Sequence, residues 1–290
     1  MKADAYRFDG KTSCDLSRLP TDAGTEKGKK AEYAEKTTAN LKKMESLQEA
    51  FYADGREGMV ILLQALDAAG KDGTIKHVMG GLNPEGVTVY NFKQPTKTEL
   101  EHDYLWRVGR CLPPRGGISI FNRSYYEDVL VVQMHQLHKG YRMADRVLQE
   151  SDREFFEKRY RQICHFEEYL YENSFRVVKI FLHLSKGEQK ERFLARIDTP
   201  DKNWKFSAAD ITERARFDEY NQLYQKVINA TASEHAPWYV LPADQKWYTR
   251  YLVSEIVVEA LQKCAPSYPK VTDQVRAEMQ RARVQLMAED

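Results

Sequence analysis

The chain has 290 residues, and 44 Lys and Arg against 43 Asp and Glu give it a formal net charge of only +1 at pH 7. This balance excludes a globally basic surface for nucleic acid, so any polyanion site must be a local cluster of Lys and Arg. No apolar run approaches the roughly 18 residues needed to span a membrane. The polar N-terminus also lacks the apolar segment of a signal peptide. We therefore expect a cytoplasmic protein without nucleic-acid or membrane partners.

Residues 1–30 are polar, and we expect them to form an extended or loosely packed arm. From residue 31 onward, segments of helical periodicity alternate with short apolar runs typical of strands. The predicted helices cover residues 31–53, 96–112, 152–173, 186–197, 208–229 and 246–264. The predicted strands cover residues 58–66, 86–92, 116–122, 176–184 and 237–243. This alternation indicates βαβ units and a parallel sheet of five strands, with ligands bound at the carboxyl ends of the strands.

The first predicted strand leads into a stretch that resembles a phosphate-binding loop, ILLQALDAAGKDGTIKHV (61–78). A loop between a buried strand and a helix directs free N–H groups and the positive end of the helix at one point. Ala65 stands at the first glycine of the usual GxxxxGK pattern, and Asp72 stands where Ser or Thr is usual. The alternative is a coincidental glycine turn. The predicted phosphate-binding residues are Ala68, Ala69, Gly70, Lys71, Asp72, Gly73 and Thr74.

Two positions offer oxygen ligands for a metal ion near this loop. Asp67 is either a helix cap or a Mg²⁺ ligand, and we favour the second because Mg²⁺ prefers hard oxygen donors. Asn122 ends the third predicted strand and provides a second, uncharged oxygen. Arg123 follows it and can bind phosphate oxygens with two parallel hydrogen bonds. Its alternative is an ion pair with a nearby carboxylate, Glu127 or Asp128.

Further basic residues follow the later strands. The stretch QKERFLARIDTPDKNWKFS contains Arg192 and Arg196 on one helical face, then Lys202 and Lys205 on a loop. Such a run is often only a solvated surface. Because it is expected near a phosphate loop, we predict a lid over an extended anion. The second strand end and the helix after it add Lys93, Arg107 and Arg110.

Other conspicuous residues are expected to be structural. His135 and His138 form an HxxH pattern without a third ligand nearby, so we do not assign them a metal. Ser124 lacks the GxSxG context of a nucleophile. Trp238 and Trp247 are expected in the core.

Six motifs in register resemble the polyphosphate kinase 2 family over about residues 30–262. They are LDAAGKDGTIKHV, FKQPT, LWR, FNRSYYEDVLV, EQKERFLARIDTPDKNWKFS and APWYVLPADQKWY. The resemblance implies a P-loop kinase-like, three-layer α/β/α sandwich with a helical lid at about 190–215. It also implies a catalytic domain over 31–264, between the arm and a C-terminal tail over 265–290. Asn122 replaces the family's usual Asp and resembles the subgroup that accepts both nucleoside monophosphates and diphosphates.

The resemblance implies Mg²⁺-dependent phosphoryl transfer from inorganic polyphosphate to AMP and ADP, which yields ADP and ATP, with Mn²⁺ as a substitute metal. It implies catalytic roles for Asp67, Lys71 and Arg123, metal binding by Asp67 and a second metal position at Asn122. The implied polyphosphate and lid residues are Arg107, Arg192, Arg196, Lys202 and Lys205. A homo-oligomer, either dimer or tetramer, is also expected. Two alternatives stay open: an ATP-dependent nucleoside monophosphate kinase of the thymidylate kinase type, and a binding module without activity.

Overall fold

The computed structural model describes residues 2–289, in which six strands form one sheet in the order β1-β6-β5-β2-β4-β3. The strands are β1 (Arg7–Phe8), β2 (Gly58–Gln64), β3 (Val87–Asn91), β4 (Ile118–Asn122), β5 (Phe175–His183) and β6 (Trp238–Pro242). Strands β2 to β6 pair in parallel, whereas β1 pairs with β6 in the antiparallel direction. The predicted five-stranded parallel sheet is therefore confirmed, and the arm adds a short sixth strand that the sequence did not predict.

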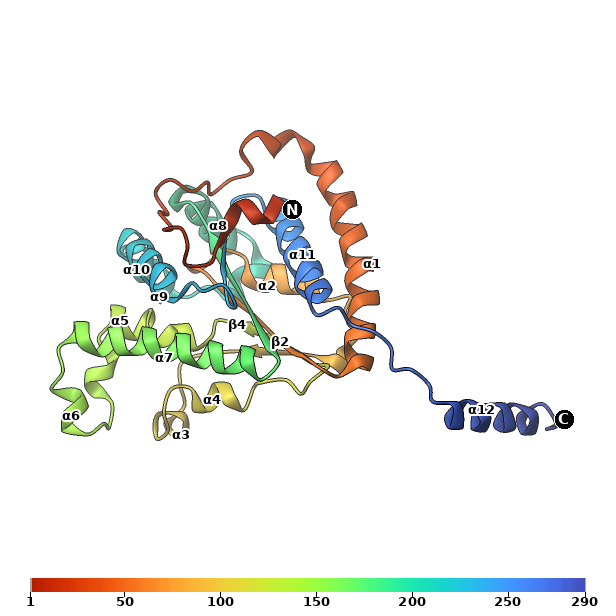
Figure 1. Cartoon of the computed structure of the whole chain (residues 1–290). Helices are drawn as coiled ribbons and strands as arrows, with labels where there is room; N and C mark the ends of the chain where they lie inside the picture. Colours follow the sequence, from red (N-terminus) through yellow and green to blue (C-terminus); the bar gives the residue numbers. More distant parts are fainter. Residues whose placement is uncertain (1, 290) are drawn as a thin grey trace.

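Helices cover both faces of this sheet and make a three-layer α/β/α sandwich (Figure 1). Helices α1 and α11 share one core cluster with the sheet, and α7 and α10 share the other. The helices are α1 (Lys30–Asp54), α2 (Lys71–Thr74), α3 (Lys97–Leu100), α4 (Trp106–Gly109), α5 (Val131–Met134), α6 (Asp145–Leu148), α7 (Asp152–Glu172), α8 (Lys186–Asp198), α9 (Ala208–Arg214), α10 (Phe217–Thr231), α11 (Lys246–Lys263) and α12 (Asp273–Leu286). Among residues 2–289, no helix is long and apolar enough to cross a membrane.

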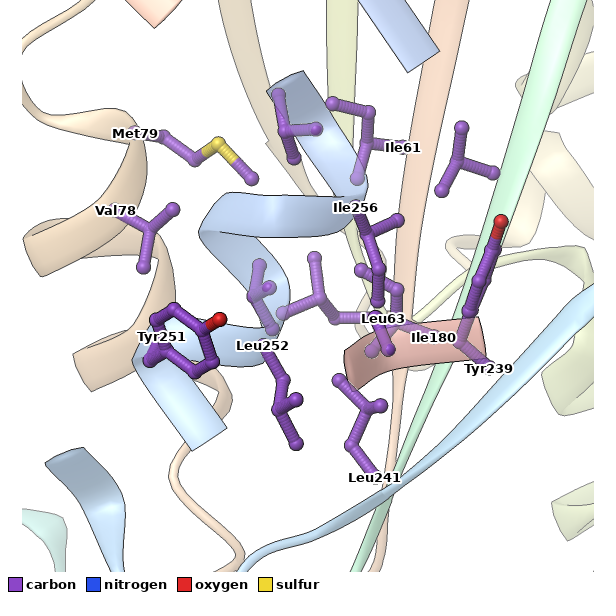
Figure 2. Packing of buried hydrophobic residues seen from close by; sticks show 14 of the residues in the cluster. Ile61, Leu63, Val78, Met79, Ile180, Tyr239, Leu241, Tyr251, Leu252 and Ile256 are labelled. Carbon is purple, nitrogen blue, oxygen red and sulfur yellow. The ribbon is translucent and has the colours of Figure 1, made fainter. Parts of the chain in front are cut away.

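Strand β2 lies inside the sheet between β4 and β5, and all seven of its residues are buried. Ile61 and Leu63 point into the layer of α1 and α11, while Leu62 points into the opposite layer. Figure 2 shows Ile61 and Leu63 near Leu252 and Ile256 of α11. Burial on both faces explains why this strand has no polar alternation. The loop after β2 is consequently fixed by the best-packed strand of the sheet.

Two helices predicted as continuous are each divided in two. The predicted helix over 96–112 starts with a capping box between Thr96 and Glu99, but it ends after one turn as α3. The backbone N–H of Leu105 then donates to the Asp103 carboxylate, and this local turn interrupts the helix before α4. The predicted helix over 208–229 is likewise divided into α9 and α10.

The N-terminal arm begins and ends in short 3-10 helices, η1 (Lys2–Tyr6) and η2 (Gly24–Lys29), and hydrogen bonds from its backbone anchor it to the domain. The N–H of Cys14 donates to Asn229 Oδ1 at 2.7 Å, and the N–H of Ala23 donates to Gln245 Oε1 at 2.7 Å. Cys14 itself is fully buried. The arm is therefore packed against α10 and the start of α11, and is not loose.

A buried ion pair joins α7 to β5 on the side of the sheet that α7 and α10 cover. Lys179 Nζ lies 2.6 Å from Glu167 Oε2, and both side chains are fully buried. The hydroxyl groups of Tyr125 and Tyr126 both donate to Glu167 Oε1 at 2.8 Å. These tyrosines stand two and three residues after Arg123, so Glu167 fixes the segment that carries the predicted phosphate-binding arginine.

Replacement of Glu167 by alanine is expected to lower the free energy of unfolding by about 3–5 kcal/mol, because it leaves the Lys179 ammonium buried without a counter-charge. Urea denaturation measures the change. The matched control is Glu157→Ala on the same helix, which removes an exposed pair with Arg153 and should cost less than about 1 kcal/mol. Equal losses in the two variants would contradict the assignment.

Candidate active site

The loop after β2 takes its shape from two residues in the left-handed region. Gly70 has φ 104° and Ala68 has φ 64°. Gly70 is the N-cap of α2, and no side chain caps this helix. Ala65 is not among the positive-φ residues of the described chain. The first glycine of the usual pattern is therefore not required here, because the backbone turns at Ala68 and Gly70 instead.

Arg192 of α8 holds this loop from below. Its guanidinium donates to the carbonyl oxygens of Ala69 at 2.7 Å and Ala68 at 3.1 Å, and also to Ala243 at 2.7 Å. Gln189 donates to the carbonyl of Asp67 at 3.0 Å. Because the N–H of a trans peptide points opposite to its C=O, the N–H groups of the same peptide units point away from α8. Arg192 was predicted as a lid cation, but in this structure it is buried and supports the loop.

Lys71 is buried at the start of α2, where its ammonium group donates to backbone carbonyls. Nζ lies 2.9 Å from the Ala65 oxygen and 3.5 Å from the Leu66 oxygen. Burial, together with the charge of Arg123, lowers the pKa of Lys71 to about 8. This cation is therefore poorly compensated in the free chain, and a phosphate group bound to the loop would stabilise its charge.

The kcat/KM of the reaction at this site, which reports the protonation state of the substrate-free chain, is consequently expected to fall above about pH 8. The pKa of Lys71 is lowered, so its ammonium form is lost above about pH 8 and kcat/KM should drop roughly tenfold per pH unit. Bound phosphate raises this pKa, so kcat should hold to higher pH. A pH profile of both constants tests this. In Lys71→Arg the guanidinium does not titrate in this range, so the fall in kcat/KM should shift to higher pH. A fall at the same pH as in the native chain would contradict the role of Lys71.

Arg123 joins two carboxylates from different elements. Its guanidinium lies 2.5 Å from Asp67 Oδ1 and 3.0 Å from Glu127 Oε2. Burial alone would lower the pKa of Arg123, but the charges of Glu127 and Asp67 outweigh it and raise that pKa. The ion pair with Glu127 that the sequence left open is thus present, together with one to Asp67. Asp67 is not a helix cap, so that alternative is wrong.

Asn122 meets two polar side chains at the same edge of the sheet. Its Nδ2 donates to Asp72 Oδ1 at 2.9 Å and to Asn91 Oδ1 at 2.8 Å. The second carboxylate oxygen of Asp72 accepts from Lys205 at 3.3 Å. In this arrangement Asp72 connects the phosphate loop to β4 and to the loop predicted as part of a lid. The amide oxygen of Asn122 makes no hydrogen bond within residues 2–289.

A basic cavity of about 900 Å³ opens above the phosphate loop. It contains the predicted residues Lys93, Arg196, Lys202 and Lys205, of which Lys202 and Lys205 lie on the short helix η7 (Pro200–Lys205). Arg196 also pairs with Asp210 at 2.9 Å. Ten lysines and arginines line the cavity against three aspartates. They are Lys71, Lys76, Lys93, Arg123, Arg192, Arg196, Lys202, Lys205, Lys246 and Arg250.

Three of these cations were not identified from the sequence: Lys76, Lys246 and Arg250. Lys246 and Arg250 stand four apart at the start of α11 and therefore share one face of that helix. Burial and the charge of Arg192 lower the pKa of Lys246, and burial lowers the pKa of Arg250. The spacing of the pair in KWYTR was the available signal, but nothing in it indicates that α11 starts beside the phosphate loop.

A second cavity, of about 1410 Å³, adjoins the first on the side of the second helix layer. Phe92, Tyr104 and Tyr125 provide aromatic walls, and Arg107 lines this cavity and not the basic one. Tyr126 is fully buried and lines neither, which excludes it from the aromatic residues that could stack on a base. Residues shared by the two cavities are Asp67, Phe92, Lys93, Arg123 and Lys205.

The other conspicuous residues have local partners. His138 lies 3.2 Å from Asp152, and His135 lies 3.1 Å from Glu213. Among residues 2–289, no group of three or more His, Cys, Asp or Glu side chains is arranged to hold a metal. Ser124 is fully buried and caps a short helix by accepting from the Tyr126 N–H. Trp238 is buried in the core as predicted, and Trp247 is partly buried against it.

A parallel sheet that carries a phosphate loop after an internal strand, with a basic helical segment above it, defines a P-loop kinase-like protein. Comparison with known families specifies the class. The profile of the polyphosphate kinase 2 family matches residues 27–269, and the chain belongs to this family.

Relatives cover nearly the whole chain. An ADP-polyphosphate phosphotransferase from Rhodopseudomonas palustris is 44% identical over 289 residues, which is 99% of each chain. An AMP/ADP-polyphosphate phosphotransferase from Meiothermus ruber is 42% identical over 91% of this chain and 95% of the relative. The crystal structure of polyphosphate kinase 2 from Arthrobacter aurescens TC1 superposes with a TM-score of 0.85 at 35% identity, over 97% of this chain and 95% of that one.

Proposed function

We propose that the chain transfers phosphoryl groups between inorganic polyphosphate and nucleotides, and phosphorylates both AMP and ADP. The observation that carries this proposal is the pair of cavities that meet at Asp67 and Arg123. The basic cavity suits a long anion, and the second combines aromatic walls with polar groups, as nucleotide sites do. The names of the relatives from Rhodopseudomonas palustris and Meiothermus ruber support the same donor and acceptors.

The chemistry requires orientation and charge more than a base. A phosphate oxygen of AMP or ADP is already ionised near neutral pH, so phosphoryl transfer depends on positioning and on neutralising the developing charge. Lys71 and the N–H groups of the loop would hold the donor phosphates. Arg123 lies at the junction of the cavities, where it would contact the transferred group. Lys202, Lys205 and Lys246 would bind the remaining chain of phosphates.

Asp67 and Asn122 fit a Mg²⁺ ion, or Mn²⁺ in its place. Mg²⁺ commonly uses one or two protein carboxylates together with substrate phosphates and water, so a preformed cluster of three ligands is not required. The Asp67 carboxylate and the amide oxygen of Asn122, which both line the basic cavity, would supply hard oxygen donors. The metal would neutralise phosphate charge when bound. Asp67 would orient it, and would then share its carboxylate less with Arg123.

A donor and acceptor screen tests the function. Purified chain with polyphosphate, Mg²⁺ and either AMP or ADP, without added ATP, is expected to form ADP and ATP, which chromatography identifies. Transfer that requires ATP would instead indicate a nucleoside monophosphate kinase, and binding without turnover would indicate a binding module. We also propose that the chain forms a homo-oligomer, either a dimer or a tetramer.

A further inference from the structure

Helix α12 projects away from the rest of the protein, at the end of an extended segment that follows α11 (Figure 1). Every residue from Val271 to Glu289 is exposed, and none of the 14 residues of α12 is buried. Isolated helices shorter than about 12–15 residues are marginal in water. A helix of this length without packing needs a partner surface to be stable.

The sequence of α12 provides such a surface along one side. Val275, Met279 and Leu286 are 43%, 59% and 66% exposed. Together with Ala282 they follow a spacing of four, three and four residues, which is the a/d pattern of a coiled coil. With Met279 and Leu286 at a positions, Val275 and Ala282 stand at d.

The charges that flank this apolar side fit a second copy of the same helix in one orientation. In the same register Glu278 stands at g and Arg283 stands at e of the next heptad. Parallel coiled coils place g of one chain beside e of the following heptad in the other, so two symmetric Glu278 to Arg283 pairs would form. An antiparallel pair would bring e beside e, and would place Arg276 and Arg283 side by side. The charges therefore favour the parallel arrangement.

We propose that α12 pairs with α12 of a second copy of this chain as a short parallel coiled coil. The apolar side of each helix covers that of the other, and the two domains lie on the same side of the pair. This proposal does not depend on the phosphoryl-transfer activity, because α12 contributes no residue to either of the two cavities of the active site. Two heptads bury little area, so the pairing should depend on protein concentration.

Disulfide trapping in the full-length chain tests the orientation. In a parallel pair each d position faces its own counterpart, so Ala282→Cys should give a disulfide-linked dimer on mild oxidation. Val284→Cys lies at f, away from the partner, and is the matched control. Dimer formed from Ala282→Cys at least fivefold faster supports the proposal. Equal rates, or no dimer, would overturn it.

Charge exchange gives a second test that does not depend on cysteine. Glu278→Arg and Arg283→Glu each place like charges opposite one another in a parallel pair. Each variant alone should therefore form a weaker dimer, which dissociates at a higher protein concentration than the native dimer. Mixed together they restore opposite charges, and differently tagged copies should form mixed dimers in preference to either homodimer. Analytical ultracentrifugation measures the masses. A statistical mixture, or concentration-independent hydrogen-exchange protection of α12 in the monomer, would contradict the pairing. Unchanged phosphoryl transfer in each variant verifies its fold.

Discussion

Replacement of Lys71 by alanine is expected to abolish measurable phosphoryl transfer while leaving the fold intact. In the free chain the Lys71 ammonium is buried and donates to the backbone carbonyls of Ala65 and Leu66. Removal of one preorganised donor from a reaction centre commonly costs about 10²- to 10³-fold in kcat. Lys71 carries a full charge in a buried site, so its removal should lower kcat by at least this factor. Steady-state assays with polyphosphate and ADP measure the loss.

The control for this variant is its stability. Since burial lowers the pKa of Lys71 to about 8, the native state carries this charge at a cost, and its removal should not lower the melting temperature appreciably. Lys202→Ala serves as a comparison because Lys202 also lines the basic cavity but is exposed. Its effect should appear mainly in KM for polyphosphate. Retained turnover in a well-folded Lys71→Ala variant would refute the assignment of the phosphate loop.

The elements that could be predicted from sequence are those with strong local signals. Strand β2 was evident because burial on both faces removes all polar alternation from GMVILLQ. The start of α7 at Ser151 carries a capping box, and this helix lies within a residue of its predicted end. The divided helices were missed because their interruptions depend on local hydrogen bonds, such as that of Asp103, which periodicity does not register.

The parts of the site that escaped prediction depend on tertiary contacts. Arg192 has the sequence character of a lid cation, yet its position beneath the loop follows from how α8 packs after β5. Lys246 and Arg250 belong to the site only because β6 lies beside β5 and delivers the start of α11 to the same edge of the sheet. Strand β1 spans two residues, too few for a periodic signal.

Replacement of Asp67 by asparagine is expected to raise the free Mg²⁺ concentration that gives half-maximal activity by at least about tenfold. Loss of a group that orients a metal ligand lowers metal affinity by at least about tenfold, and loss of the ligand itself should lower it by at least as much. The neutral amide keeps the shape of the side chain but loses the charge. Rates measured against free Mg²⁺ give this shift. Electron paramagnetic resonance of free Mn²⁺, with ADP present, measures the loss of metal binding without turnover.

Asp201→Asn is the matched control, because Asp201 is an exposed aspartate that lines the same basic cavity. It removes the same charge, so a general electrostatic effect would raise the required Mg²⁺ concentration equally in both variants. A specific ligand role shifts only Asp67→Asn. A normal rate of that variant at limiting Mg²⁺ would contradict the role. The ion pair between Asp67 and Arg123 sharpens the expectation: an asparagine holds the guanidinium less firmly, so the variant should bind polyphosphate at least as well as the native chain while transferring it more slowly.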